Sequence, residues 1–201
     1  MDGVFIYWFG WMAWALVTFL LPKTKARLYL AIFILLLIIL IPHQGEIVGY
    51  HVNFGYIVAV VYCSFHFRKM RWPTLLYTSL ISCIIASAYA SYHLILLYDP
   101  VISLYDSRLV ISAIIFGMAY FTFSTWKNRF LVTMSGLLQG EWMYTMIVKK
   151  LFMTATVGSL YFFDIMALSL TVNSTVWFIH FLLQKISTLI QEKKNSTVVE
   201  A

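Results

Sequence analysis

Long apolar runs, separated by short polar or basic segments, make up most of the chain. The longest run without a charged residue includes 73–98. A hydrocarbon core of ~30 Å is crossed by about 20 apolar residues in a helix, so this run is long enough to span a membrane. Similar runs predict further helices at about 3–21, 26–42, 50–67 and 108–126, one from 130 onward, and one within 151–184. The pattern therefore predicts an all-α transmembrane bundle of about seven spans.

The run 73–98 has two different faces when it is drawn as a helix with about 100° per residue. Small or polar side chains fall on one face, at Ser79, Ser82, Cys83, Ala86, Ala90 and His93. Bulky side chains fall on the other, at Ile81, Ile84, Ile85, Tyr92, Ile95 and Leu96. Because small residues let helices approach closely in lipid, we expect the small face to contact other helices and the bulky face to contact lipid. This helix is therefore expected at the centre of the bundle.

A second signal for close helix packing is the GxxxG spacing of Gly136 and Gly140. Such glycines permit close contact between helices in a membrane. The predicted helix-packing residues are Ser79, Cys83, Ala86, Ala90, Gly136 and Gly140.

The composition agrees with a membrane protein that has little mass outside the bilayer. The 201 residues are 62% hydrophobic and 11% charged, whereas soluble proteins have about 25% charged residues. We expect one domain, a bundle over 1–185, and a polar cytoplasmic tail over 186–201. The net charge of +6 comes from short clusters between apolar runs, which favours membrane lipids over nucleic acid as partners. A membrane protein or a second copy of the chain is the other kind of partner to consider.

The basic clusters also orient the chain, because Lys and Arg are enriched in cytoplasmic loops. The residues assigned to the cytoplasm are Lys23, Lys25, Arg27, Arg68, Lys69, Arg71, Lys127, Arg129, Lys185, Lys193 and Lys194. The acids assigned to the outside are Asp2, Glu46, Asp99, Asp106 and Glu141. This predicts a multi-pass plasma-membrane protein with its N-terminus outside and its C-terminus in the cytoplasm. Lys149 and Lys150 fall on the outside and break the pattern.

The run 151–184 is too long for one crossing, since as a single helix it measures roughly 51 Å. Three alternatives remain open. The helix protrudes into the cytoplasm, it breaks near Gly158 or between Thr171 and Thr175, or its first turns belong to an outer hairpin. The preceding helix is expected to weaken at 139–141.

Four ionisable residues form the candidate polar pocket: His93, Asp99, Glu141 and Asp164. Asp164 is the strongest signal, because a carboxylate at the bilayer centre costs about 2.5–3.5 kcal/mol on insertion scales. It is either a proton or cation site, or a structural acid that bonds to a neighbouring helix or lies nearer the outer surface.

The other pocket candidates have similar alternatives. Glu141 either lines an outward vestibule or ends its helix at the interface beside Trp142. His93 either relays protons or binds metal, or it is an interfacial histidine bonded to a backbone carbonyl or a hydroxyl. Asp99 lies in the outer loop that follows the helix of His93.

No sequence motif identifies a reaction or a cofactor. Cys63 and Cys83 lie in apolar runs without a CxxC spacing, so neither a disulfide framework nor a zinc site is expected. The sequence contains no HExxH, GxSxG or glycine-rich phosphate loop, and 151–184 contains no lysine for a retinal Schiff base. We therefore expect a protein without enzymatic activity, metal or cofactor.

Several short segments together suggest a family. They are Tyr7-Trp8-Phe9-Gly10-Trp11, Ala90-Ser91-Tyr92-His93, Tyr98-Asp99-Pro100, Gln139-Gly140-Glu141, and Gly158-Ser159-Leu160 with Asp164. In these segments the chain resembles the YphA-type family, a group of uncharacterised membrane proteins from Bacillus-like bacteria. The resemblance covers most of the chain. It implies a bacterial plasma-membrane setting and no assigned activity.

Three functions are consistent with these observations. The first is a membrane scaffold or regulatory partner, whose polar residues serve packing. The second is a transporter or channel for a small solute, an ion or protons, with an outward-facing pocket at His93, Glu141 and Asp164. The third is a membrane-embedded enzyme that acts on lipid, which ranks last because no nucleophile and base lie at suitable spacing.

Overall fold

The computed structural model describes residues 2–47, 49–99, 106–152 and 156–199, with side chains up to residue 188. Seven helices occur in these ranges: α1 (Val4–Leu20), α2 (Lys25–Leu40), α3 (Phe54–Phe67), α4 (Trp72–Tyr98), α5 (Ser107–Thr122), α6 (Trp126–Phe152) and α7 (Leu160–Val199). Three short strands accompany them: β1 (Gln44–Ile47), β2 (Tyr50–Asn53) and β3 (Thr156–Val157). The number of helices agrees with the predicted number of segments, and the number that crosses the bilayer stays a prediction.

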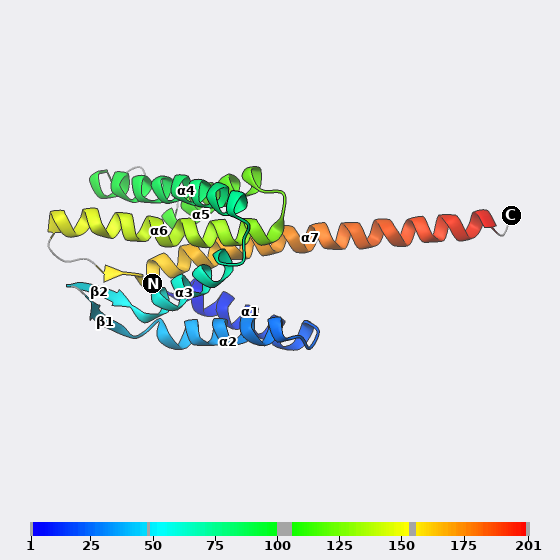
Figure 1. Ribbon diagram of the computed structural model, residues 1–201, viewed down its shortest axis with the longest axis horizontal. Coiled ribbons are helices and arrows are strands. Elements are labelled where there is room, and N and C mark those ends of the chain that lie inside the picture. Colours follow the sequence, from blue (N-terminus) through cyan, green and yellow to red (C-terminus); the bar gives the residue numbers. More distant parts are fainter. Residues whose placement is uncertain (1, 48, 100–105, 153–155, 200–201) are drawn as a thin grey trace.

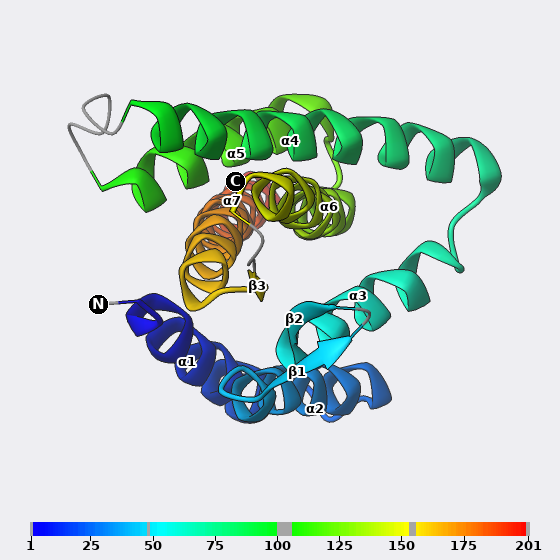
Figure 2. The same cartoon turned by 90° about the vertical axis from the view of Figure 1, so that its left-hand side faces the viewer.

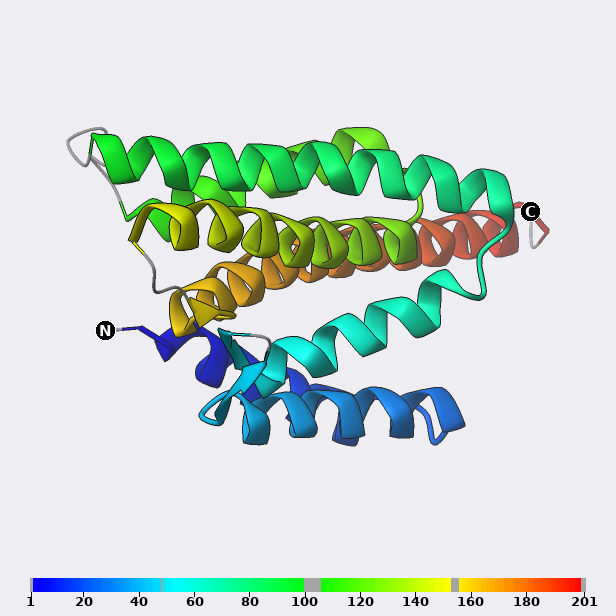
Figure 3. The same cartoon turned by 60° about the vertical axis from the view of Figure 1, so that its left-hand side comes forward.

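Helices α6 and α7 occupy the centre of the bundle, with α4 and α5 on one side and α1 to α3 on the other (Figures 2 and 3). The expectation that the helix over 73–98 is central was wrong. That helix, α4, lies on the outside and packs along α6. The central position of α6 and α7 is reflected in two continuously buried stretches, 131–138 of α6 and 162–169 of α7. Leu137, Phe162, Phe163 and Ile165 in these stretches are fully buried.

The contact between α4 and α6 joins large side chains to glycines. Ala86 and Ala90 are buried, whereas Ser79 and Cys83 are exposed. Ile85, which was expected to face lipid, is fully buried.

Two glycines explain the buried bulky side chains. A Cβ added at Gly136 would lie 2.6 Å from Cγ2 of Ile85, and one at Gly140 would lie 2.9 Å from Cβ of Tyr89. The space that the glycines of α6 leave is therefore filled by bulky side chains of α4, and not by small ones.

A small β-sheet at one end of the bundle corrects the all-α prediction. Strand β1 pairs antiparallel with β2, and β2 pairs parallel with β3. The turn between β1 and β2 contains Gly49 with φ 73°, a left-handed conformation that glycine adopts without strain. Asn53 ends β2 and begins α3, since its side chain accepts a hydrogen bond from the N–H of Gly55 at 2.8 Å.

The segment between α6 and α7 decides between the alternatives for the long apolar run 151–184. Helix α6 continues through 139–141 to Phe152, so the expected weakening at Glu141 was wrong. The break lies at Gly158, which has φ 76°, and α7 then runs as one helix of 40 residues. Its second half projects from the bundle (Figure 1). The expected tail at 186–201 is therefore helical as far as Val199.

Within the described ranges, two helices are long and apolar enough to cross a bilayer by themselves, at 72–98 and 160–188. Helices α1, α3 and α5 are apolar but shorter. The two ends of the bundle differ in their connections. The sheet lies at one end, and the basic α1–α2 and α3–α4 connections lie at the other (Figure 1).

Candidate functional site

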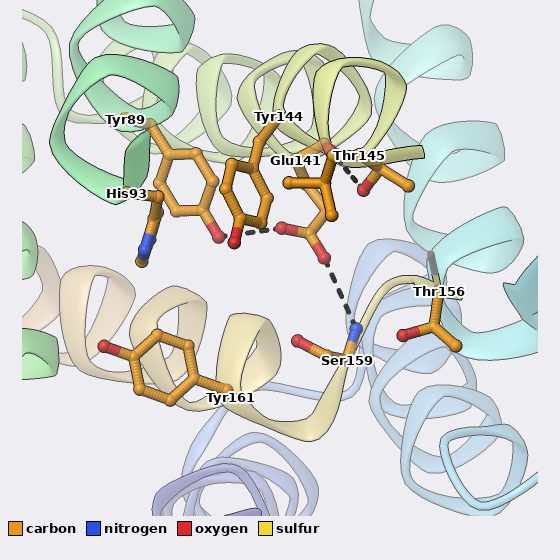
Figure 4. Close-up of a pocket in the computed structure, with 9 residues that line it drawn as sticks. Tyr89, His93, Glu141, Tyr144, Thr145, Thr156, Ser159 and Tyr161 are labelled. Carbon is orange, nitrogen blue, oxygen red and sulfur yellow. Dashed lines mark hydrogen bonds between the residues drawn. The ribbon is translucent and has the colours of Figure 1, made fainter. Parts of the chain in front are cut away.

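A cavity of about 340 Å³ lies between α4, α6 and the start of α7, near the sheet (Figure 4). Its lining is mostly polar and aromatic, and consists of Tyr89, His93, Glu141, Tyr144, Thr145, Val148, Thr156, Ser159 and Tyr161. Helix spacing places these residues together: Tyr89 and His93 are one turn apart on α4, and Glu141, Tyr144, Thr145 and Val148 share one face of α6. The volume is in the lower range for pockets that hold small molecules.

Glu141 is the only carboxylate among the residues that line this cavity. It is buried, and its two oxygens accept hydrogen bonds from three donors: the hydroxyl of Tyr89 at 2.8 Å, the N–H of Gly158 at 3.1 Å and the N–H of Ser159 at 3.4 Å. Gly158 has a positive φ of 76°, and the two backbone donors of this turn bind the same carboxylate oxygen. In the described part of the chain, no Lys, Arg or His nitrogen lies within 4 Å of it.

His93 is surrounded by tyrosine rings. Its ring centroid lies 4.3 Å from that of Tyr89, 5.4 Å from Tyr144 and 5.7 Å from Tyr161. The imidazole is buried, and its Nε2 has no hydrogen-bond partner among the residues that the structure describes. The predicted bond to a backbone carbonyl or hydroxyl is therefore absent at Nε2 in the described part of the chain.

Asp164 does not line the cavity. It is fully buried, forms an ion pair with Arg108 at 2.9 Å, and accepts hydrogen bonds from the N–H groups of Gly3 at 2.8 Å and Ile6 at 2.9 Å. Because α7 begins at Leu160, Asp164 lies near the end of the bundle that carries the sheet. Its charge is compensated by Arg108 and by the N-terminus of α1, where a carboxylate is favourable.

Asp99 is also outside the cavity. It is exposed and forms the C-cap of α4, where its backbone N–H donates to the carbonyl of Ile95 at 2.9 Å. Of the four predicted pocket residues, the structure thus brings together His93 and Glu141, and separates Asp99 and Asp164 from them.

Sequence reasoning missed the tyrosines of the cavity and the role of Arg108. The spacing of Tyr89 and His93, and of Glu141 and Tyr144, was the available signal, because residues three or four apart share a helix face. Tyr161 links the two sites: its ring contacts His93, and the guanidinium carbon of Arg108 lies 5.0 Å from its centroid. Within the described ranges, no group of three or more potential metal ligands is present.

Comparisons with known proteins identify the family. The sequence profile of the YphA-like integral membrane proteins matches residues 2–198. The chain is 27% identical over 158 residues to the uncharacterized protein YphA of Bacillus subtilis (strain 168), covering 79% of this chain and 78% of that one. No solved structure matches the chain significantly. The chain therefore belongs to the YphA-like family of integral membrane proteins, whose Bacillus subtilis relative is uncharacterized.

Proposed function

We propose that this protein is a multi-pass plasma-membrane protein that acts without catalysis as a regulatory partner, and that it binds a small protonated amine in the cavity at Glu141. In the orientation predicted from the basic residues, this cavity opens to the outside. The observation that carries the proposal is a buried carboxylate in a tyrosine-lined cavity, with no cation of the described chain beside it.

The charge of Glu141 supports a cationic ligand. A buried ionised group is costly unless it is paired, and the three groups that bond to Glu141 are neutral donors. The two backbone N–H groups can only donate, so they favour the ionised carboxylate, while burial acts against it unless a cation is bound. The faces of tyrosine rings also attract cations, and Tyr144 and Tyr161 lie on opposite sides of the cavity (Figure 4).

The imidazole of His93 supports a ligand that carries N–H groups. Its buried Nε2 has no partner in the described residues, and the neutral ring can accept a hydrogen bond there. A primary alkylammonium carries N–H groups that can donate to a carboxylate or an imidazole, whereas a quaternary ammonium has none. The modest volume favours a short alkyl chain.

The packing next to the cavity supports binding over transport. On the side away from the sheet, α4 and α6 are in close contact, where a Cβ at Gly140 would lie 3.0 Å from the carbonyl oxygen of Ala86. The next turn is equally close, at Gly136 and Ile85. A cavity that ends at such a contact holds a ligand without offering it a path through the bundle.

Calorimetric titration of the purified full-length protein in nanodiscs tests the proposal. Propylammonium should bind, while 1-propanol, of similar size and without charge, should bind at least tenfold more weakly. Tetramethylammonium should also bind more weakly than propylammonium. Glu141→Gln should reduce propylammonium affinity at least tenfold, and the matched change Glu46→Gln, at an exposed residue of β1, should leave it unchanged.

Two results would contradict this function. Equal binding of propylammonium and 1-propanol would show that charge is not recognised. Flux of labelled propylammonium into proteoliposomes that is lost in Glu141→Gln would instead favour the transporter.

A further inference from the structure

Where helix α7 leaves the bundle, it is still apolar, and the rest of the described chain does not cover it. Its first turns are buried, as at Phe162 and Met166, but the helix continues well beyond the bundle (Figure 1). The apolar side chains that follow Trp177 are between 41% and 60% exposed: Phe178, Ile179, Phe181, Leu182, Leu183 and Ile186.

The position of these side chains relative to the membrane makes their exposure unusual. Trp177 contacts Trp126, with ring centroids 4.9 Å apart, and Trp126 begins α6 next to Lys127. Tryptophan is enriched at both interfaces of a membrane protein, and basic residues are enriched at the cytoplasmic one. In the orientation predicted from the basic residues, the apolar side chains that follow Trp177 therefore extend past this interface toward the cytoplasm, and the described bundle does not cover them.

A heptad pattern runs along this exposed face. Its core positions are Val172, Thr175, Ile179, Leu182 and Ile186, and Leu189 continues the spacing in the sequence. From Ile179 onward the pattern has Ile at position a and Leu at position d, the arrangement that favours parallel two-stranded coiled coils. The described side chains of this set are half-exposed or exposed, so the seam is available to another helix.

We infer that two copies of this protein pair through the projecting part of α7, in a parallel two-stranded coiled coil with Ile179, Leu182 and Ile186 at its core. The inference stands apart from the proposed ligand and does not depend on it.

Membrane insertion favours a second copy of this chain over other partners for the projecting part of α7. Two copies that share one orientation in the bilayer present their α7 helices parallel and at the same height, as the Ile and Leu pattern requires. A two-fold axis along the seam brings each core residue next to its own counterpart. Anchoring in the membrane also raises the effective concentration of the two helices, so that a seam of little more than two heptads suffices.

Disulfide formation between single cysteines tests the pairing in native membranes. In a full-length background with Cys63→Ala and Cys83→Ala, Ile179→Cys, Leu182→Cys and Ile186→Cys should give a cross-linked dimer on mild oxidation. The matched exposed positions Gln184→Cys and Ser187→Cys, on the far side of the helix, should cross-link at least fivefold less.

Energy transfer between differently labelled copies in nanodiscs provides a second measurement. Ile186→Asp should abolish the transfer, because a carboxylate at a core position is buried unpaired, while Gln184→Asp should retain it. The inference is overturned by equal cross-linking at all five positions, by the strongest cross-linking at 184 or 187, by no dimer at any position, or by cross-linking to a different protein alone.

Discussion

Asp164 of α7 and Arg108 of α5 form an ion pair at 2.9 Å, although 56 residues separate them in the sequence. The same Arg108 side chain contacts Asp2 at 2.5 Å, and Asp164 bonds to the first N–H groups of α1. This pair therefore joins the starts of α1, α5 and α7 at the end of the bundle that holds the cavity.

Replacing Asp164 by Asn should destabilise the fold. Breaking a buried ion pair by removing one partner costs about 3–5 kcal/mol. Because Asp2 and Asp106 still compensate Arg108, we expect a loss of about 1–3 kcal/mol in the free energy of unfolding. Denaturant unfolding in detergent micelles measures it.

A double-mutant cycle with Arg108→Met separates the pair from its surroundings. The two changes should be non-additive, with a coupling energy of about 1–3 kcal/mol. Additive losses would show that Asp164 stabilises α1 alone.

The sequence identified the helices well because apolar runs and charged connections mark them directly. It also identified Asp164 as the strongest signal among the candidate ionisable residues. It did not reveal the partner of Asp164, since contact between residues 108 and 164 depends on how α5 and α7 lie side by side, which no local spacing encodes.

The orientation of α4 was harder to predict for a related reason. The helix wheel separates small from bulky residues, but Ile85 is buried because Gly136 of α6 makes room for it. Which face packs depends on the shape of the neighbouring helix. The three strands are short, and β3 is held by pairing with β2. None of them therefore shows a clear alternation of apolar and polar residues in the sequence.

The glycines of α6 should tolerate no side chain. Gly136→Ala places a Cβ 2.6 Å from Cγ2 of Ile85 and 3.2 Å from the carbonyl oxygen of Ser82, and such overpacking costs about 1–3 kcal/mol. Gly117→Ala in α5 is the matched control, because nothing lies within 4 Å of the added atom. It should be neutral or stabilise the helix by about 0.5–1 kcal/mol. Thermal unfolding of both variants in nanodiscs compares them, and equal midpoints would contradict the close contact.

The two side-chain caps at Asn53 and Thr24 should differ in strength. Asn53 is buried, caps α3, and donates to the carbonyl of Ile41 at 2.5 Å, so Asn53→Ala should cost about 2–3 kcal/mol from the lost cap and the unpaired carbonyl. Thr24 is exposed and caps α2 with a bond to Arg27 at 3.3 Å, so Thr24→Ala should cost about 0.5–1 kcal/mol. Chemical unfolding measures both. A larger loss at Thr24 would contradict the role of Asn53 in joining β2 to α3.

Cysteine labelling should place the sheet and the α3–α4 connection on opposite sides of the membrane. The two regions lie at opposite ends of the bundle (Figure 1), and the basic residues assign the connection to the cytoplasm. With Cys63→Ala and Cys83→Ala, a membrane-impermeant maleimide added to intact cells should label Glu46→Cys and leave Met70→Cys unlabelled. Permeabilised cells should label both, which shows that Met70→Cys is reactive once it is reached. Labelling of Met70→Cys alone in intact cells would reverse the orientation and turn the cavity at Glu141 toward the cytoplasm, and labelling of both would mean that α3 does not cross the bilayer.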